Sequence, residues 1–152
     1  MSGLDWQGME IALREPKTAD ELDRYYDLRW RVLRSSWTQD GKNYRDEREP
    51  NSLHMTAWIG DQLVGTGRLH LLNGEEVQVR SMAVEQGFER RGIGGLILRE
   101  LEKRAVERGA RRVVLDARDS AVPFYRKLGY QVLEQSYTLF NEIVHWRMWK
   151  DL

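Results

Sequence analysis

The stretch that decides the fold runs from residue 82 to residue 98 and reads MAVEQGFERRGIGGLIL. It begins with an apolar triplet that completes a strand pattern, and it leads into an amphipathic segment that predicts a helix over residues 92–108. Three glycines, Gly92, Gly94 and Gly95, fall in the first turn of that helix. Each glycine costs about 1 kcal/mol relative to alanine inside a helix, so three together indicate a local requirement.

One explanation is a ligand that touches the backbone at these glycines, where any Cβ would block its approach. The start of a helix offers unpaired N–H groups and the positive end of the helix dipole, so the favoured ligand is an anion such as a phosphate. Arg90 and Arg91 come directly before the glycines and supply charged donors. The alternative explanation is that the glycines allow close packing of the helix on a sheet.

Two common phosphate motifs fit this stretch poorly. The P-loop requires Gly-Lys-Ser/Thr, which the sequence does not contain. The dinucleotide fingerprint requires a glycine or alanine where Ile97 stands, and it requires glycines directly after the strand, whereas seven residues separate Val84 from Gly92. Asp116 lies near the spacing of a ribose-binding acid, which keeps a dinucleotide-binding protein as the weakest alternative.

The rest of the chain predicts a mixed α/β (α+β) fold in a single domain over residues 1–152. Thr18 followed by Glu21 is a capping-box pattern that opens a helix through residue 33. Residues 35–51 are expected to form a loop or short irregular helix, with the charged residues 45–49 as a solvated face. The remaining predicted elements are strands 9–14, 53–59, 63–72, 76–84, 112–117, 130–137 and 143–149 and a helix over 120–128.

Composition excludes several classes of function. The 152 residues carry 24 basic and 24 acidic side chains, so the zero net charge argues against nucleic acid as a partner. The chain has no cysteine, which excludes disulfides, cysteine nucleophiles and cysteine-bound metals. No segment approaches the roughly 20 apolar residues of a membrane span, and the N-terminus lacks a secretory pattern. We therefore expect a cytoplasmic protein with no membrane partner.

Two motifs together resemble the GNAT family of acyl-CoA N-acyltransferases. Its phosphate loop, Gln/Arg-x-x-Gly-x-Gly/Ala, follows a strand that ends in a triplet like residues 82–84, and residues 89–94 match it except that Glu89 takes the first position. Its second signature is similar to AVPFYRKLGY at residues 121–130. Small bacterial members with a tail like residues 142–145 (EIVH) are the most similar.

The resemblance implies a mostly antiparallel central sheet flanked by helices and splayed at the strand that ends at Val84. Acetyl-CoA is the implied cosubstrate, with its pantetheine arm along this strand and its pyrophosphate on the glycine-rich loop. The implied cofactor-binding residues are Met82, Ala83, Val84, Arg90, Arg91, Gly92, Ile93, Gly94, Gly95 and Phe124.

The implied reaction is transfer of an acetyl group from acetyl-CoA to a primary amine. Tyr125 holds the family position whose hydroxyl protonates the departing thiolate; the alternative is a core aromatic. Without cysteine there is no cysteine acyl-enzyme, which favours direct attack of the amine in a ternary complex. The general base stays open: Gln78 and Arg80 are unsuited, Glu76 and His70 are marginal, and a water chain is an alternative. His54, His70 and His145 show no ligand spacing, so no metal is expected.

The acceptor is expected to be a small-molecule amine or a peptide or protein amine, bound by the first helix and the loop after it. Candidate residues there are Arg29, Trp30, Arg31, Arg34, Trp37, Asp46, Glu47 and Glu49. The acidic groups among them are candidates to attract a cationic amine, with surface charge and packing as the alternative. Trp146 and Trp149 suggest an edge contact for a homodimer. A non-catalytic acyl-CoA-binding sensor module remains the second functional hypothesis.

Overall fold

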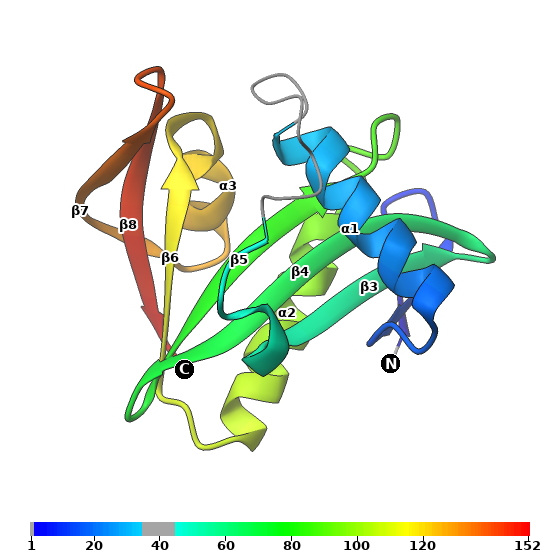
Figure 1. The fold of residues 1–152 in the computed structure, drawn as a ribbon, viewed down its shortest axis with the longest axis horizontal. Helices are drawn as coiled ribbons and strands as arrows, with labels where there is room; N and C mark the ends of the chain where they lie inside the picture. Colours follow the sequence, from blue (N-terminus) through cyan, green and yellow to red (C-terminus); the bar gives the residue numbers. More distant parts are fainter. Residues whose placement is uncertain (1, 35–44) are drawn as a thin grey trace.

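The computed structural model describes residues 2–34 and 45–152 and is built around one eight-stranded sheet (Figure 1). The strand order is β1-β2-β3-β4-β5-β6-β8-β7, in which only β5 and β6 pair in parallel. The strands are β1 (Ser2–Leu4), β2 (Glu10–Arg14), β3 (Leu53–Ile59), β4 (Gln62–Asn73), β5 (Glu76–Val84), β6 (Arg112–Arg118), β7 (Gln131–Leu139) and β8 (Ile143–Asp151). The helices are α1 (Ala19–Leu33), α2 (Ile93–Glu107) and α3 (Val122–Lys127), with short 3-10 turns η2 (Glu49–Asn51) and η3 (Asp119–Ala121).

Helix α1 begins where the capping-box pattern predicts. The Thr18 side chain accepts a hydrogen bond from the Glu21 N–H at 3.1 Å, which satisfies one of the free donors at the helix start. The Glu21 carboxylate in turn binds Arg14 of β2, with N–O distances of 2.6 and 2.8 Å. The helix buries Tyr25 and Leu28 together with Ala83 of β5, so α1 covers one face of the sheet.

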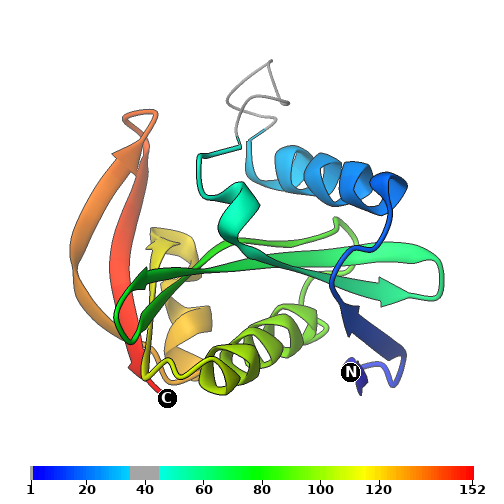
Figure 2. The same cartoon turned by 60° about the horizontal axis from the view of Figure 1, so that its bottom comes forward.

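Helix α2 covers the opposite face, as Figure 2 shows. Its residues Ile93, Ile97 and Leu101 are fully buried in the main core. The helix lies very close to β4, because a Cβ on Gly65 would stand 2.6 Å from Ile97 and one on Gly67 would stand 2.7 Å from the same side chain. Glycine at these two strand positions therefore sets how near α2 comes to the sheet.

A bulge in β5 interrupts its pairing with β4. Thr66 pairs with Ala83 and Arg68 with Arg80, so β5 advances three residues where β4 advances two. Ser81 takes the left-handed conformation (φ 56°), and its carbonyl accepts a hydrogen bond from the Thr66 hydroxyl at 2.9 Å. A bulge bends and twists the strand that contains it, which re-aims the last residues of β5.

Beyond the bulge, β5 and β6 separate. Their parallel pairing covers Glu76–Val79 against Arg112–Leu115 and stops there. β6 continues to Arg118 in contact with β8, while β5 continues to Val84 in contact with β4. The expected splay of the sheet at the strand that ends at Val84 is confirmed. The predicted mixed fold with a mostly antiparallel sheet is confirmed as well.

The edges of the sheet differ from the prediction in two ways, one a strand that was missed and the other an edge contact that was wrong. β1 was not predicted, because three residues (SGL) carry no alternating pattern and the strand exists only through its pairing with β2. Trp146 and Trp149 do not lie at an edge, since β8 runs between β6 and β7. The Trp146 N–H donates to Asp119 at 2.8 Å, and Arg112 covers the Trp149 ring at 4.5 Å. The predicted edge contact through these two tryptophans is therefore wrong, because neither lies on an edge strand.

The predicted solvated face at residues 45–49 was also wrong at Glu49, which is only 7% exposed. Its carboxylate binds Arg29 of α1 at 2.7 and 3.0 Å and contacts Arg68 of β4, and both arginines are 1% exposed. Arg68 also binds Asp46 at 2.9 Å. This cluster of Arg29, Arg68, Asp46 and Glu49, here called the buried ion cluster, joins α1, η2 and β4.

Burial alone would raise the pKa of Glu49, but the bonds and charges of Arg29 and Arg68 outweigh it and hold that pKa below the usual value. A lowered pKa in the folded state means that the carboxylate stabilises the protein at neutral pH. That stabilisation is lost as the pH falls below the ordinary glutamate value of 4.5.

Within the described part of the chain, no helix has both the length and the apolar character needed to cross a bilayer.

Replacing Glu49 by glutamine tests the buried ion cluster. We expect the free energy of unfolding to fall by about 3–5 kcal/mol at pH 7, because two buried guanidiniums lose their shared counter-charge. The loss should narrow as the pH falls below 4.5, because the unfolded chain then takes up a proton at Glu49 while the folded protein, with its lower pKa, takes it up only at still lower pH. Urea unfolding monitored by tryptophan fluorescence measures both effects.

The matched control is Asp27→Asn, which removes the exposed ion pair between Asp27 and Arg31. That change should cost less than about 1 kcal/mol. Equal losses for the two variants would contradict the role given to Glu49.

Candidate active site

A cavity of about 190 Å³ opens where β5 and β6 separate. Met82 of β5 and Ala117 of β6 line it from the two sides of the gap, and Tyr125 of α3 lines it as well. Tyr137 of β7 and His145 of β8 complete the wall on the side of the β7–β8 hairpin. The cavity therefore lies between elements that are distant in sequence.

The three residues that end β5 face different ways. Ala83 is buried against α1, whereas Met82 and Val84 pack on the side of α2. On the β6 side, no strand of the described residues pairs with their backbone, because the β5–β6 pairing ends at Val79. An extended amide-bearing ligand can pair with this open edge as an added strand would.

The glycine-rich loop leads into an uncapped helix. Gly92 is the N-cap of α2 with φ 85°, and no side chain accepts hydrogen bonds from the first turn. Leu96 is the first residue whose N–H donates a hydrogen bond of the helical type, to the Gly92 carbonyl at 3.1 Å. The N–H groups of residues 93–95 thus have no intrahelical acceptor and lie at the positive end of a 15-residue helix.

Protein packing explains some of these glycines and not others. Gly92 needs its positive φ, and a Cβ there would stand 2.5 Å from the Trp6 indole nitrogen. A Cβ on Gly94 would stand 3.1 Å from the Phe124 ring, which is tight. At Gly95 the nearest atom, on Leu128, is 3.9 Å away, an ordinary contact. The packing alternative therefore accounts for Gly92, in part for Gly94, and not for Gly95.

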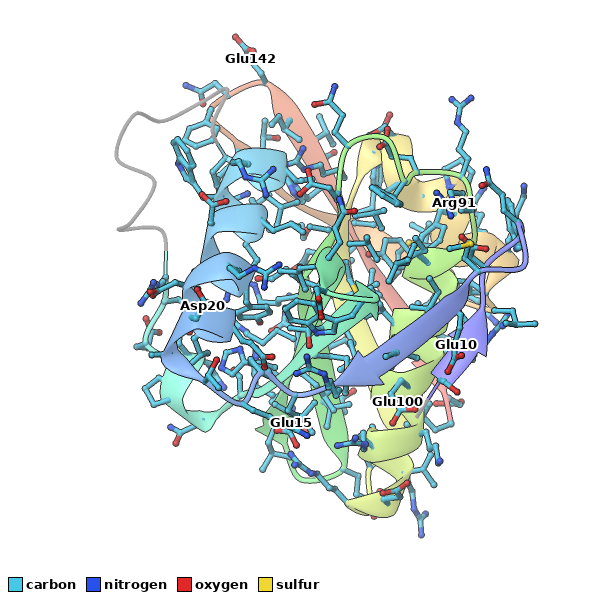
Figure 3. All side chains as sticks on the ribbon, turned by 90° about the vertical axis from the view of Figure 1, so that its right-hand side faces the viewer. Glu10, Glu15, Asp20, Arg91, Glu100 and Glu142 are labelled. Carbon is cyan, nitrogen blue, oxygen red and sulfur yellow. The ribbon has the colours of Figure 1, made fainter. Side chains whose placement is uncertain are left out.

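Arg90 and Arg91 have different surroundings. The Arg91 guanidinium binds the buried Asp5 carboxylate at 2.5 and 2.7 Å, and the Arg91 carbonyl accepts from the Trp6 N–H at 2.8 Å. Figure 3 shows Arg91 beside the hairpin formed by β1 and β2. Arg90 is exposed and has no carboxylate partner among residues 2–34 and 45–152. The loop's uncompensated positive side chain is thus Arg90.

Glu89, which departs from the family pattern, uses its carboxylate in a contact within the same loop. It accepts a hydrogen bond from the Gly87 N–H at 2.5 Å. The side chain at this position therefore shapes the loop and adds no positive charge to it.

Tyr125 lies in the wall of the cavity and is 8% exposed. Its ring packs edge-on against Phe124 and Tyr130, with ring centroids 4.9 and 5.9 Å apart. Its hydroxyl makes no hydrogen bond with the residues that the structure describes, although Tyr25 and Tyr130 both use theirs. Burial raises the pKa of Tyr125, so the phenol stays protonated at neutral pH and has a proton to donate.

The base candidates named from the sequence do not gather at the cavity. Glu76 lies at the far end of β5, bonded to Asn73 at 3.0 Å. His70 is buried, and burial together with Arg68, Arg48 and Arg80 lowers its pKa to about 4, but it does not line the cavity. Gln78 donates to Asp116 at 3.3 Å. Of this group only Arg80 lines the cavity.

His145 was missed as a base candidate, and the structure places it in the cavity wall at 4% exposure. Its Nδ1 lies 2.9 Å from the Ile143 carbonyl, which only accepts, so Nδ1 carries the proton. Burial and the charges of Arg118 and Arg34 lower the pKa of His145. The hydrogen bond to the Ile143 carbonyl and the charge of Asp116 act in the opposite direction but do not outweigh them. A neutral ring with a proton on Nδ1 leaves a lone pair on Nε2, which is what a general base requires.

The acceptor candidates on α1 are partly brought to the cavity. Arg29, Arg34 and Asp46 line it, whereas Arg31 binds Asp27 and Glu85 outside it. Glu47 is exposed, and Trp37 lies outside the described residues. Trp30 does not line the cavity.

Asp116, which a ribose-binding site would require, is instead held by Arg147 at 2.8 and 3.2 Å. The residue that favoured dinucleotide binding thus has a structural partner. Among the described residues, no group of three or more histidine, aspartate or glutamate side chains is arranged to hold a metal ion.

Comparison with known proteins identifies this arrangement. The model of the acetyltransferase (GNAT) family matches residues 22–130. The chain belongs to the GNAT family. The Bacillus subtilis protein YjcF, described as an uncharacterized N-acetyltransferase, is 33% identical over 135 residues, which cover 89% of this chain and 96% of YjcF. This GNAT protein is therefore an acetyltransferase enzyme.

Solved structures share the fold. A Bacillus subtilis acetyltransferase in complex with CoA gives a TM-score of 0.72 at 23% identity, covering 93% of this chain and 97% of that one. A GNAT family acetyltransferase from Elizabethkingia anophelis with acetyl-CoA bound gives 0.77 at 15% identity, covering 93% and 98%. At these identities the likeness establishes the GNAT fold.

The state of His145 is directly measurable. Nitrogen-edited NMR of the histidine rings at pH 7 should show His145 neutral with its proton on Nδ1, and its pKa should lie below 6.5. His54 is the internal control, since its Nε2 faces the Glu49 carbonyl and its Nδ1 lies 2.7 Å from the Tyr25 hydroxyl, which predicts the opposite tautomer. A charged His145 ring at pH 7, or a proton on Nε2, would overturn its candidacy as a base.

Proposed function

We propose that this enzyme binds acetyl-CoA in the gap between β5 and β6 and transfers the acetyl group directly to a primary amine in a ternary complex. The observation that carries the proposal is the end of the β5–β6 pairing at Val79, beside the uncapped start of α2. The gap offers an open strand edge, and the helix start offers unpaired N–H groups for a diphosphate. The two solved relatives that hold CoA or acetyl-CoA support the same cosubstrate here.

The residues predicted for the cosubstrate have distinct tasks in this proposal. Backbone groups of Met82 and Val84 pair with the pantetheine amides, and Ala83 anchors the strand against α1. The N–H groups of residues 90–95, which include Arg91, Gly92, Ile93, Gly94 and Gly95, bind the pyrophosphate, and the Arg90 guanidinium adds charge. Phe124, which is 39% exposed beside Gly94, supplies an apolar surface where the pantetheine passes α3.

Two side chains of the cavity supply the proton chemistry. The lone pair on His145 Nε2 accepts the proton that leaves the amine as nitrogen bonds to the acetyl carbon. As the carbon–sulfur bond breaks, the Tyr125 hydroxyl passes its proton to the departing sulfur, which becomes the CoA thiol. Tyr125 then regains a proton from solvent while His145 releases one to solvent, so both side chains return to their starting states. The amine thus loses one proton and the thiolate gains one, so the products are the acetylated amine and CoA.

Reversing the charge of Arg90 tests the cosubstrate site. Acetyl-CoA should raise the melting temperature of the native protein, and Arg90→Glu should weaken its binding about 10- to 100-fold, as expected when a charged hydrogen bond to phosphate is lost. Titration calorimetry with acetyl-CoA gives the two dissociation constants.

Arg99→Glu is the matched control, because Arg99 is exposed on α2 about one turn beyond the last of the glycines, Gly95. It should bind acetyl-CoA nearly as the native chain does. An unchanged melting temperature of the native protein at millimolar acetyl-CoA would refute the proposed function.

Removing the hydroxyl of Tyr125 tests its role. Since that hydroxyl has no partner among the described residues, Tyr125→Phe should leave the melting temperature and the KM for acetyl-CoA nearly unchanged. The kcat should fall about 100-fold, the typical contribution of a positioned proton donor. Rates of CoA release with the fastest acceptor of an amine panel measure this. A kcat within twofold of the native value would leave Tyr125 as a core aromatic only.

A further inference from the structure

The part of the cavity that faces α1 is rich in arginine. Arg29 comes from α1, Arg34 directly follows that helix, Arg80 comes from β5 and Arg118 from the end of β6. Among residues 2–34 and 45–152, the lining contains two carboxylates, Asp46 and Asp116. In Figure 1 the upper end of β6, the β7–β8 hairpin and α1 surround this region.

Both carboxylates are already bound by arginines. Asp116 pairs with Arg147. Asp46 binds Arg68 at 2.9 Å and Arg80 at 3.5 Å. Neither acid is left to attract a cationic amine, so the expectation that acidic side chains recruit the acceptor is not supported here.

The buried ion cluster with Arg80 has three guanidiniums and two carboxylates, since Arg29 and Arg68 share Glu49. Its net charge is therefore positive. Burial is the first cause of the lowered pKa of both His145 and His70. The charges of Arg118 and Arg34 lower the pKa of His145 further, and those of Arg68, Arg48 and Arg80 lower that of His70 further, although Asp116 and Asp46 act in the opposite direction.

Arg118 has the surroundings of a ligand-binding arginine. It is half-buried in the cavity wall, and one nitrogen donates to the Leu33 carbonyl at 2.6 Å, which fixes the side chain against the end of α1. No carboxylate of residues 2–34 or 45–152 forms an ion pair with it. A guanidinium has five N–H donors in a planar fork that matches carboxylate and phosphate groups.

We propose that the acceptor is an amine that also carries an anionic group, a carboxylate or a phosphate, and that Arg118 binds this group. The inference rests on the proposed function and names the substrate class of that site. The anion neutralises the excess positive charge of the wall. The same positive charge disfavours the ammonium form of the acceptor, which helps to supply the neutral amine that attacks.

Matched acceptor pairs test the proposal by CoA release. Suitable pairs are phenylalanine with phenethylamine, tyrosine with tyramine, and phosphoethanolamine with ethanolamine, in which the second member lacks the anion. We expect kcat/KM at least about tenfold higher for the anionic member, the gain expected from a charged hydrogen bond. The amino acids and phosphoethanolamine distinguish carboxylate from phosphate. Equal or faster turnover of the neutral members would overturn the inference.

A binding measurement tests whether Arg118 binds an anion, even if the enzyme acetylates none of the amines in the panel. With acetyl-CoA saturating, inorganic phosphate or acetate should raise the melting temperature of the native protein. Arg118→Gln should abolish this rise and Arg118→Lys should keep part of it. Arg111→Gln is the control, because Arg111 is exposed just before the opposite end of the same strand. An identical anion response in Arg118→Gln and Arg111→Gln, or no response in the native protein, would refute the inference.

The two proposals fail in different ways. If acetyl-CoA itself does not stabilise the native protein, the proposed function fails. If acetyl-CoA stabilises the native, Arg118→Gln and Arg111→Gln proteins alike but anions have no effect through Arg118, only the acceptor class is wrong.

Discussion

The hydrogen bonds between β5 and β6 end at Val79 and Leu115, and the active site depends on that ending. The bulge at Ser81 bends the last residues of β5 away from β6. β6 stays paired with β8 over its whole length and does not follow β5. One extra residue in a strand thus produces both the cavity and the open strand edge beside it. The chain that leaves β5 after Val84 then forms the loop that leads into the glycine-rich start of α2, where we propose that the pyrophosphate binds.

Elements on both faces hold this gap in place. Gly65 and Gly67 set α2 close against β4 on one face. On the other face the buried ion cluster fixes α1 to η2 and β4, and Arg31 of α1 binds Glu85 just after β5 at 2.8 Å. The charges that fasten α1 also leave an excess of arginine in the cavity wall.

Much of the fold could be predicted from the sequence, because helices and hairpins depend on local patterns. The Thr18 cap, the amphipathic stripe of α2 and the meander from β3 to β5 appear at or near the predicted residues. The uncapped glycine-rich start of α2 also lies where the three glycines predicted a helix start, and its binding of an anion stays a prediction. β1 was not, because its three residues become a strand only when β2 lies beside them.

The errors at the site have one physical origin, which is contact between distant residues. Glu49 lies in a run of five charged residues and looks solvated until Arg29 and Arg68 are placed on either side of it. His145 has no neighbouring ligand in sequence, and its value as a base comes from the Ile143 carbonyl and a cavity built by other strands. The one signal in the sequence for His145 as a base was a histidine in the last predicted strand, residues 143–149.

If acetyl-CoA occupies the gap between β5 and β6, it shields the open edge of β5 and the start of α2 from solvent. Amide hydrogen exchange, measured residue by residue with and without saturating acetyl-CoA, detects this shielding. We expect exchange to slow at residues 82–84 and 90–95 in the complex, and to change little at the far ends of β5 and β6, near Glu76 and Arg112. Binding that leaves residues 82–84 unprotected, or that protects only the far ends, would contradict it.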